Sequence, residues 1–167
     1  MRRPVKARRS GRGARRSAAG DIGLWRMIDA NANRVREGLR VCEDLVRLCL
    51  GSEAGFRRVR ALRYAVSRQL TALPIAREAL LRARDTRQDP GRRSRPSTIR
   101  SAPQLLIINL QRAKEGLRVL EDSARVVAPP AVTGFQTLRF RVYDLERDLL
   151  LGLAAVRDRR SRRRRRP

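Results

Sequence analysis

Residues 31–47 read NANRVREGLRVCEDLVR, and residues 109–125 repeat the pattern as NLQRAKEGLRVLEDSAR, with identity at ten of 17 aligned positions. Apolar residues in and around the first copy recur at alternating steps of four and three, at Ile28, Ala32, Val35, Leu39, Cys42, Val46 and Cys49. This spacing places them on one face of an α-helix. The second copy shows the same steps from Leu106 to Val127. The sequence therefore predicts two related amphipathic helices.

A second apolar helical pattern follows each copy, so each repeat unit, about 24–72 and 102–150, is predicted to be a helical hairpin. The following helices also echo each other, with Leu62-Arg63-Tyr64 matching Leu138-Arg139-Phe140. Two hairpins can bury their apolar faces against one another. The predicted fold class is all-α: a pseudo-twofold bundle of two helical hairpins with a short connecting helix and a long central loop.

Capping and helix-breaking residues indicate where the helices begin and end. Helix starts are expected at Asp21, Ser52, Ser101 and Thr133, and an end at Gly51. Ser101 and Thr133 are each followed three residues later by a glutamine, which is a capping-box pattern. Pro74 is expected in the first turn of a short third helix. Residues 85–100, with two prolines and five arginines, remain as the central loop.

Charge is concentrated at the two ends of the chain. The protein has 41 Lys and Arg against 16 Asp and Glu, a net charge of +25. Residues 1–16 carry eight cations and no acid, and residues 157–167 carry eight arginines against one acid. Because runs of like charge repel and bury little apolar surface, residues 1–20 and 157–167 are predicted to be disordered basic tails around a single domain, 21–156. Such tails can contact nucleic acid non-specifically.

Cysteine and histidine usage narrows the function classes. Cys42 and Cys49, seven residues apart on one helix, stand about 10 Å apart and cannot form a disulfide. We expect both to be buried, reduced thiols of a cytoplasmic protein. There is no histidine, which removes the commonest general base and the commonest metal ligand. No apolar run reaches the length of a membrane span, so no membrane association is expected.

Most of the identities between the two copies are polar and lie beside the core stripe. Paired core positions differ, as Val35/Ala113 and Cys42/Leu120 show. Packing tolerates apolar exchange, so the retained polar residues indicate a further role. We predict a substrate site from the residues on one flank of the stripe, namely Asn31, Arg34, Glu37, Gly38, Asn109, Arg112, Glu115 and Gly116. On the other flank, Glu43 and Arg47 have ion-pair spacing, and a purely structural role is favoured for both.

Gly38 and Gly116 lie in the middle of the predicted helices. A glycine there costs about 1 kcal/mol relative to alanine. Its presence at two equivalent positions indicates close approach by another backbone or by a ligand. Two readings stay open: close helix packing across the pseudo-twofold axis, or a ligand resting over Gly38 with Arg34 and Glu37 beside it.

The central loop and its border carry a second set of candidates. Arginine guanidinium groups suit phosphate, so Arg84, Arg92 and Arg93 are predicted phosphate-binding residues. Paired carboxylates suit Mg²⁺, so Asp85 and Asp89 are predicted metal ligands. The alternative is a solvated linker. Neither GxxxxGK[ST] nor GxGxxG occurs, so no standard nucleotide-binding loop is present.

Both copies of the repeat match a known family. The residues that match are Asp29–Arg34, Glu37–Val41, Glu43-Asp44, their counterparts between Asn109 and Asp122, the stretch Arg84-Asp85 with Asp89-Pro90-Gly91, and Leu138–Glu146. The chain resembles, over about residues 24–150, a helical domain found alone or fused ahead of the barrel of bacterial thiamine-phosphate synthases. That family has been proposed as an alternative phosphomethylpyrimidine kinase of thiamine biosynthesis. The barrel itself is missing, so thiamine-phosphate synthase activity is not expected of this polypeptide.

The resemblance implies ATP-dependent phosphorylation of 4-amino-5-hydroxymethyl-2-methylpyrimidine phosphate to the diphosphate. ATP and Mg²⁺ would be the cofactors, and a thiamine-phosphate synthase is a candidate partner. One alternative is a non-catalytic helical module that binds the pyrimidine phosphate or docks on a synthase barrel. The other is an Arg-rich nucleic-acid-binding protein, which the small number of aromatic residues available for base stacking disfavours.

Overall fold

The computed structural model describes residues 12–95 and 98–164, and over these residues it contains helices and no strands. The five α-helices are α1 (Arg12–Asp44), α2 (Glu53–Thr71), α3 (Arg77–Ala83), α4 (Ala102–Val127) and α5 (Val132–Arg164). A π-helical turn, η1 (Leu45–Cys49), continues α1, and two 3₁₀ turns, η2 (Pro90–Arg93) and η3 (Pro129–Ala131), precede α4 and α5. The predicted all-α class is confirmed.

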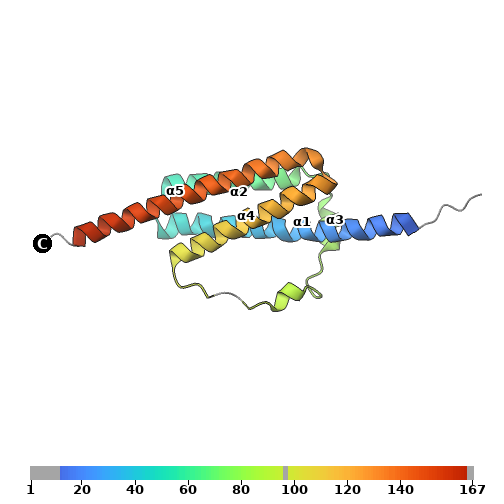
Figure 1. Cartoon of the computed structure of the whole chain (residues 1–167), viewed down its shortest axis with the longest axis horizontal. Coiled ribbons are helices and arrows are strands. Elements are labelled where there is room, and N and C mark those ends of the chain that lie inside the picture. Colours follow the sequence, from blue (N-terminus) through green and yellow to red (C-terminus); the bar gives the residue numbers. More distant parts are fainter. Residues whose placement is uncertain (1–11, 96–97, 165–167) are drawn as a thin grey trace, which may run out of the picture.

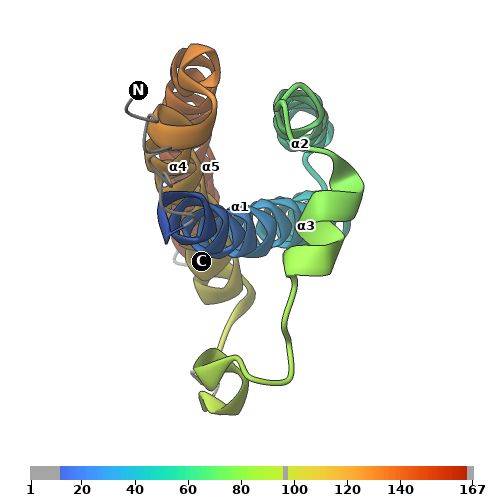
Figure 2. The same cartoon turned by 90° about the vertical axis from the view of Figure 1, so that its right-hand side faces the viewer.

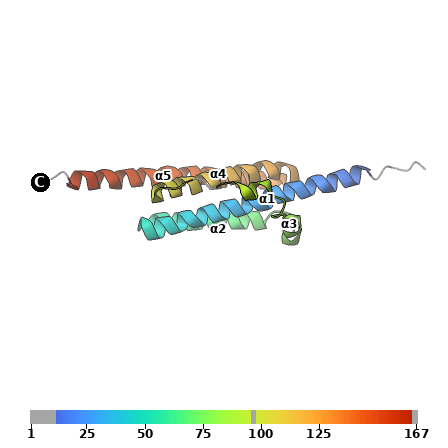
Figure 3. The same ribbon diagram turned by 90° about the horizontal axis from the view of Figure 1, so that it is seen from below.

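The helices form two antiparallel hairpins, α1 with α2 and α4 with α5 (Figure 1). The hairpins join through α1 and α4, which pack against each other in the middle of the molecule, and α2 also contacts α5. Seen end-on, α2 and α5 lie on one side of the α1–α4 pair, and η2 lies on the other side (Figure 2). The view from below places η2 in front of the α1–α4 pair (Figure 3).

The core forms where the four long helices meet. Both predicted stripes are buried from Ile28 to Val46 and from Leu106 to Ala124, and Phe135 is the largest fully buried side chain. Each helix packs through one apolar face, so the two hairpins bury these faces against one another and form one core. No helix in the described part of the chain is long and apolar enough to cross a bilayer.

Several predicted helix boundaries are confirmed. Gly51 ends the first helical segment with φ of 61°, a left-handed conformation that suits glycine. The Ser52 hydroxyl accepts a hydrogen bond from the Gly55 amide at 3.2 Å, as expected of a helix-capping serine. The Ser101 hydroxyl likewise accepts from the Gln104 amide at 3.3 Å.

Three predicted starts are wrong. Asp21 lies inside α1, which begins at Arg12. Pro74 precedes α3, because Ala76 is still extended (φ −61°, ψ 136°) and the helix starts only after it. Thr133 lies inside α5, since the 3₁₀ turn η3 leads directly into Val132 and leaves no extended residue to act as a cap.

The predicted disorder of 1–20 and 157–167 falls partly on residues 1–11 and 165–167, which are outside the described residues. Over 12–20 and 157–164 the structure instead continues α1 and α5 as helix. Arginine is a good helix former, and both segments extend helices that are already packed in the bundle. Charge repulsion therefore did not decide the backbone conformation of these residues.

The two cysteines differ in exposure. Cys42 is fully buried, as predicted, but Cys49 is exposed, contrary to the prediction. The cause is η1, where the Leu50 amide donates to the Leu45 carbonyl five residues earlier. A π-helical turn rotates less per residue than an α-helical one, so Cys49 no longer lies on the core stripe.

This difference predicts selective thiol chemistry. Burial raises the pKa of the Cys42 thiol to about 12, so Cys42 stays protonated and unreactive near pH 8. Iodoacetamide applied to the folded protein at pH 8 is expected to add one group, at Cys49, and to add two after denaturation. Intact-mass analysis with peptide mapping measures this. Equal labelling of both cysteines in the folded protein would contradict the burial of Cys42.

Candidate functional site

A groove of about 650 Å³ runs between α1 and α4. Such a volume lies within the range of small-molecule sites, about 300–1,000 Å³. All eight residues predicted to bind substrate line it, together with two valines: Asn31, Arg34, Glu37, Gly38 and Val41 from α1, and Asn109, Arg112, Glu115, Gly116 and Val119 from α4. The two copies of the repeat therefore contribute equivalent residues to one shared groove rather than forming two separate sites.

The two glycines allow α1 and α4 to approach closely at this point. A Cβ atom added at Gly38 would stand 2.9 Å from the Asn109 carbonyl oxygen. One added at Gly116 would stand 3.3 Å from the Asn31 carbonyl oxygen and 2.6 Å from Cγ2 of Val35. Close helix packing across the pseudo-twofold axis, the first of the two readings, is confirmed. Because the same glycines line the groove, their missing side chains also leave its floor open.

These two contacts set the register of the antiparallel helices. Seven residues forward along α1, from Asn31 to Gly38, correspond to seven residues back along α4, from Gly116 to Asn109. Position 34 therefore lies opposite position 113, which puts Arg34 and Arg112 within about 1.5 Å of the same level along the helix axes. The order along the groove is Asn31, Glu115, Arg34, Arg112, Glu37 and Asn109.

Two arginines thus lie at the middle of the groove, a glutamate lies outside each of them, and an asparagine lies at each end. The four charged side chains are exposed to solvent, and their charges balance. The Glu115 carboxylate accepts a hydrogen bond from the Gln111 side-chain amide at 2.8 Å. Arg34 donates to the Asn31 side-chain oxygen at 3.3 Å and not to Glu37, the partner that helical spacing offered.

The two asparagines are held rigidly at the groove ends. Each is buried, and its side-chain amide nitrogen donates at 2.8 Å to the carbonyl four residues earlier, Met27 for Asn31 and Leu105 for Asn109. The side-chain oxygen of Asn109 has no hydrogen-bond donor among the described residues. Since its nitrogen is fixed, this oxygen is an acceptor positioned at the wall of the groove.

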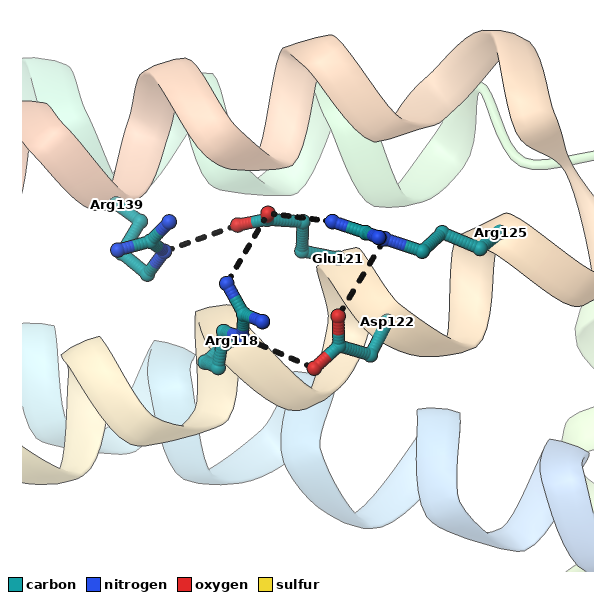
Figure 4. Close-up of polar contacts among 5 residues, drawn as sticks. All are labelled: Arg118, Glu121, Asp122, Arg125 and Arg139. Carbon is teal, nitrogen blue, oxygen red and sulfur yellow. Dashed lines mark hydrogen bonds and ion pairs between the residues drawn. The ribbon is translucent and has the colours of Figure 1, made fainter.

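On the opposite flank of each repeat, a buried glutamate joins the two helices of a hairpin. The Glu43 carboxylate pairs with Arg63 of α2 at 2.6 Å, and the Glu121 carboxylate pairs with Arg139 of α5 at 2.9 Å. Donating these hydrogen bonds to the glutamates raises the pKa of both arginines. Arg118 and Arg125 add longer contacts to Glu121, at 3.5 and 3.6 Å (Figure 4).

These pairs give Glu43 the structural role favoured from the sequence, but through a different partner. Glu43 pairs with Arg63, while the Arg47 guanidinium lies over the Phe56 ring, 5.9 Å from its centroid. The roles of Arg63 and Arg139 were not predicted. The matching Leu-Arg-Tyr and Leu-Arg-Phe triplets were the signal that could have found them, since both arginines come directly after a core leucine.

The structure does not bring the predicted loop residues into the groove. Arg84 donates two hydrogen bonds, each of 2.7 Å, to the Asp29 carboxylate and so attaches the end of α3 to α1. The Arg92 guanidinium donates to the Thr86 carbonyl at 3.4 Å. Arg93 is exposed on η2.

The two predicted metal ligands stabilise turns of the loop. The Asp85 carboxylate accepts from the backbone amides of Arg87 and Gln88 at 3.1 Å. The Asp89 carboxylate accepts from the Gly91 amide at 2.8 Å and caps η2. Across residues 12–95 and 98–164, no three Asp, Glu or Cys side chains cluster as a metal site would require. Binding of Mg²⁺ by Asp85 and Asp89 stays a prediction.

The fold and the groove together define an internally duplicated helical protein with a polar site between its copies. The model of the ThiD2 family matches residues 26–148. This range contains all the buried residues of the core, from Ile28 to Leu145. The chain belongs to the ThiD2 family.

Curated relatives agree with this assignment. The chain is 38% identical over 142 residues to a thiamine-phosphate synthase of Gloeobacter violaceus, covering 80% of this chain and 40% of that protein. Thiamine-phosphate synthases of Nostoc sp. and Synechocystis sp. are each 35% identical, over 133 and 135 residues, covering 76% and 79% of this chain. The chain spans 35% and 38% of those two proteins, less than half of the relatives it matches. No solved structure matches it significantly.

Proposed function

We propose that the protein acts in thiamine biosynthesis and that its α1–α4 groove phosphorylates 4-amino-5-hydroxymethyl-2-methylpyrimidine phosphate to the diphosphate, with ATP as donor. The observation that carries this proposal is the gathering of the shared polar residues of both repeats in one groove, with two guanidinium groups at its middle. Membership of the ThiD2 family and the similarity to thiamine-phosphate synthases support the pathway.

The chemistry of this reaction suits a site without histidine. An oxygen of the substrate's phosphate attacks the γ-phosphorus of ATP, a new P–O–P bond forms, and the bond between the γ-phosphorus and the β–γ bridging oxygen breaks to release ADP. Because a phosphate monoester loses its second proton at a pKa of about 6, the attacking oxygen is already ionised near neutral pH. The site needs no general base.

What the protein must supply is position and charge neutralisation. Arg34 and Arg112 stand at one level of the groove on opposite helices and can each donate forked hydrogen bonds to a phosphate. Mg²⁺ is carried largely by nucleotide phosphates and water, so it requires few protein ligands. When bound, it supplies further neutralisation of the phosphate charges. The groove residues do the rest by holding the two phosphates together.

The test is an assay of purified protein with ATP, Mg²⁺ and the pyrimidine phosphate, in which ADP and the pyrimidine diphosphate are both quantified. We expect equal amounts of the two products, and at least a hundredfold lower rate with the unphosphorylated pyrimidine alcohol, which lacks the ionised nucleophile. A conventional kinase for this substrate is the positive control. Binding of the pyrimidine phosphate without any ADP would reject catalysis and favour a non-catalytic binding module.

A further inference from the structure

The groove has nearly the same residues on both halves, yet the proposed reaction needs two different ligands. The pseudo-twofold axis passes between Arg34 and Arg112, and each half outside the axis offers one glutamate and one asparagine. Glu115 and Asn31 lie on one side, and Glu37 and Asn109 lie on the other. Each of these pairs combines one residue from each helix, so neither repeat alone forms a complete half.

This order matches what two phosphorylated ligands require when they react. The phosphates must meet, and the middle of the groove is where the two cationic side chains lie. The organic parts of both ligands carry hydrogen-bond donors, a ring amino group on the pyrimidine and hydroxyl and amino groups on the nucleoside. Carboxylate and amide oxygens at the two ends can accept from these donors. Their placement separates the two organic groups while their phosphates stay together.

The two ends of the groove differ at the side-chain oxygens of their asparagines. At one end, the side-chain oxygen of Asn31 already accepts a hydrogen bond from Arg34 at 3.3 Å. At the other end, the side-chain oxygen of Asn109 has no donor among the described residues, so it is free to accept a hydrogen bond from a ligand.

We propose that the two substrates occupy opposite halves of the groove and meet with their phosphates between Arg34 and Arg112: one ligand lies toward Glu115 and Asn31, and the other lies toward Glu37 and Asn109. This inference rests on the proposed function and adds to it. Glu37 and Glu115, equivalent residues of the repeat, are specificity-determining residues for different ligands.

Calorimetric binding separates the two glutamates without depending on turnover. The probes are the pyrimidine phosphate and adenylyl imidodiphosphate with Mg²⁺, each titrated alone and then into protein saturated with the other. We expect Glu37→Gln to raise Kd for one of the two ligands by about tenfold or more and to leave the other within twofold. Glu115→Gln is expected to weaken the other ligand to a similar extent and to spare the first, and the wild type is expected to bind both ligands at once.

Both glutamates are exposed, so the variants should fold; circular dichroism and melting temperature verify this. Glu53→Gln, an exposed change on α2 outside the groove, is the matched control and should alter neither affinity. Weakening of the same ligand by both variants, weakening of neither ligand, or competition between the two ligands in the wild type would overturn the inference. If both ligands bind with the expected pattern but no diphosphate forms, the proposed function fails and the two-ended arrangement stands.

Discussion

Glu121→Ala is expected to lower the free energy of unfolding by about 3 kcal/mol, because it removes one partner of a buried ion pair. Only 1% of the Glu121 side chain is exposed, and its carboxylate accepts a hydrogen bond from the Arg139 guanidinium. The Arg139 side chain is 12% exposed. Without the glutamate, Arg139 stays largely buried with no counter-charge. The two longer contacts from Arg118 and Arg125 are lost as well, although these side chains can turn into solvent.

Asp122→Ala is the matched control for this experiment. Asp122 is adjacent in sequence and pairs with the same two exposed arginines, but its side chain is 47% exposed. An exposed pair contributes little, so the loss should stay below about 1 kcal/mol. Urea unfolding followed by circular dichroism measures both variants. Equal losses for Glu121→Ala and Asp122→Ala would show that burial of the carboxylate is not what matters.

A double variant separates the ion pair from the packing around it. Replacing Glu121 and Arg139 together, by Leu and Met, removes both charges and keeps the volume apolar. Such replacements of whole buried pairs are often neutral. We therefore expect the double variant to be more stable than Glu121→Ala despite carrying more changes.

The fold was largely predictable because its determinants are local. The steps of four and three from Ile28 to Val46, repeated from Leu106, predict which faces are buried, and the structure confirms them. The features that could not be predicted depend on local backbone geometry, which the residue types in these segments do not indicate. The π-helical turn that exposes Cys49 and the 3₁₀ turn that leads into Val132 are examples.

The candidate site also has one part that could be predicted from the sequence and one part that could not. The eight helical residues could be selected from sequence because the internal repeat provides two copies of the same helix, which can be compared position by position. The polar residues are identical in the pairs Arg34/Arg112 and Glu37/Glu115, whereas paired residues of the core differ between the two copies. No such comparison exists for the loop, which occurs once. There residue type alone suggested phosphate and metal binding, and the structure shows Arg84 paired with Asp29 and Asp85 in a turn.

The other large effect is expected from Arg34→Gln combined with Arg112→Gln. Each replacement keeps a polar side chain and removes one forked cationic donor from the middle of the groove. A hydrogen bond to a charged group contributes about 1.5–3 kcal/mol, so the pair should change affinity for a phosphorylated ligand by a hundredfold or more. Both arginines are exposed, so the stability of the fold should change little.

A second cavity in the bundle supplies a stringent comparison. It has a volume of about 640 Å³, lies among α1, α2 and α3, and is lined in part by Arg36 and Arg77. Arg36 is two residues from Arg34 on the same helix and is likewise exposed. Arg36→Gln combined with Arg77→Gln therefore removes the same charge from a site of similar size elsewhere in the molecule.

The affinity of these two double variants for the pyrimidine phosphate, measured by calorimetry against wild type, tests most directly whether the α1–α4 groove is the functional site. We expect the Arg34→Gln, Arg112→Gln protein to lose at least a hundredfold in affinity and the Arg36→Gln, Arg77→Gln protein to stay within twofold. Full affinity in the first protein, or a large loss in the second alone, would contradict the assignment of the groove.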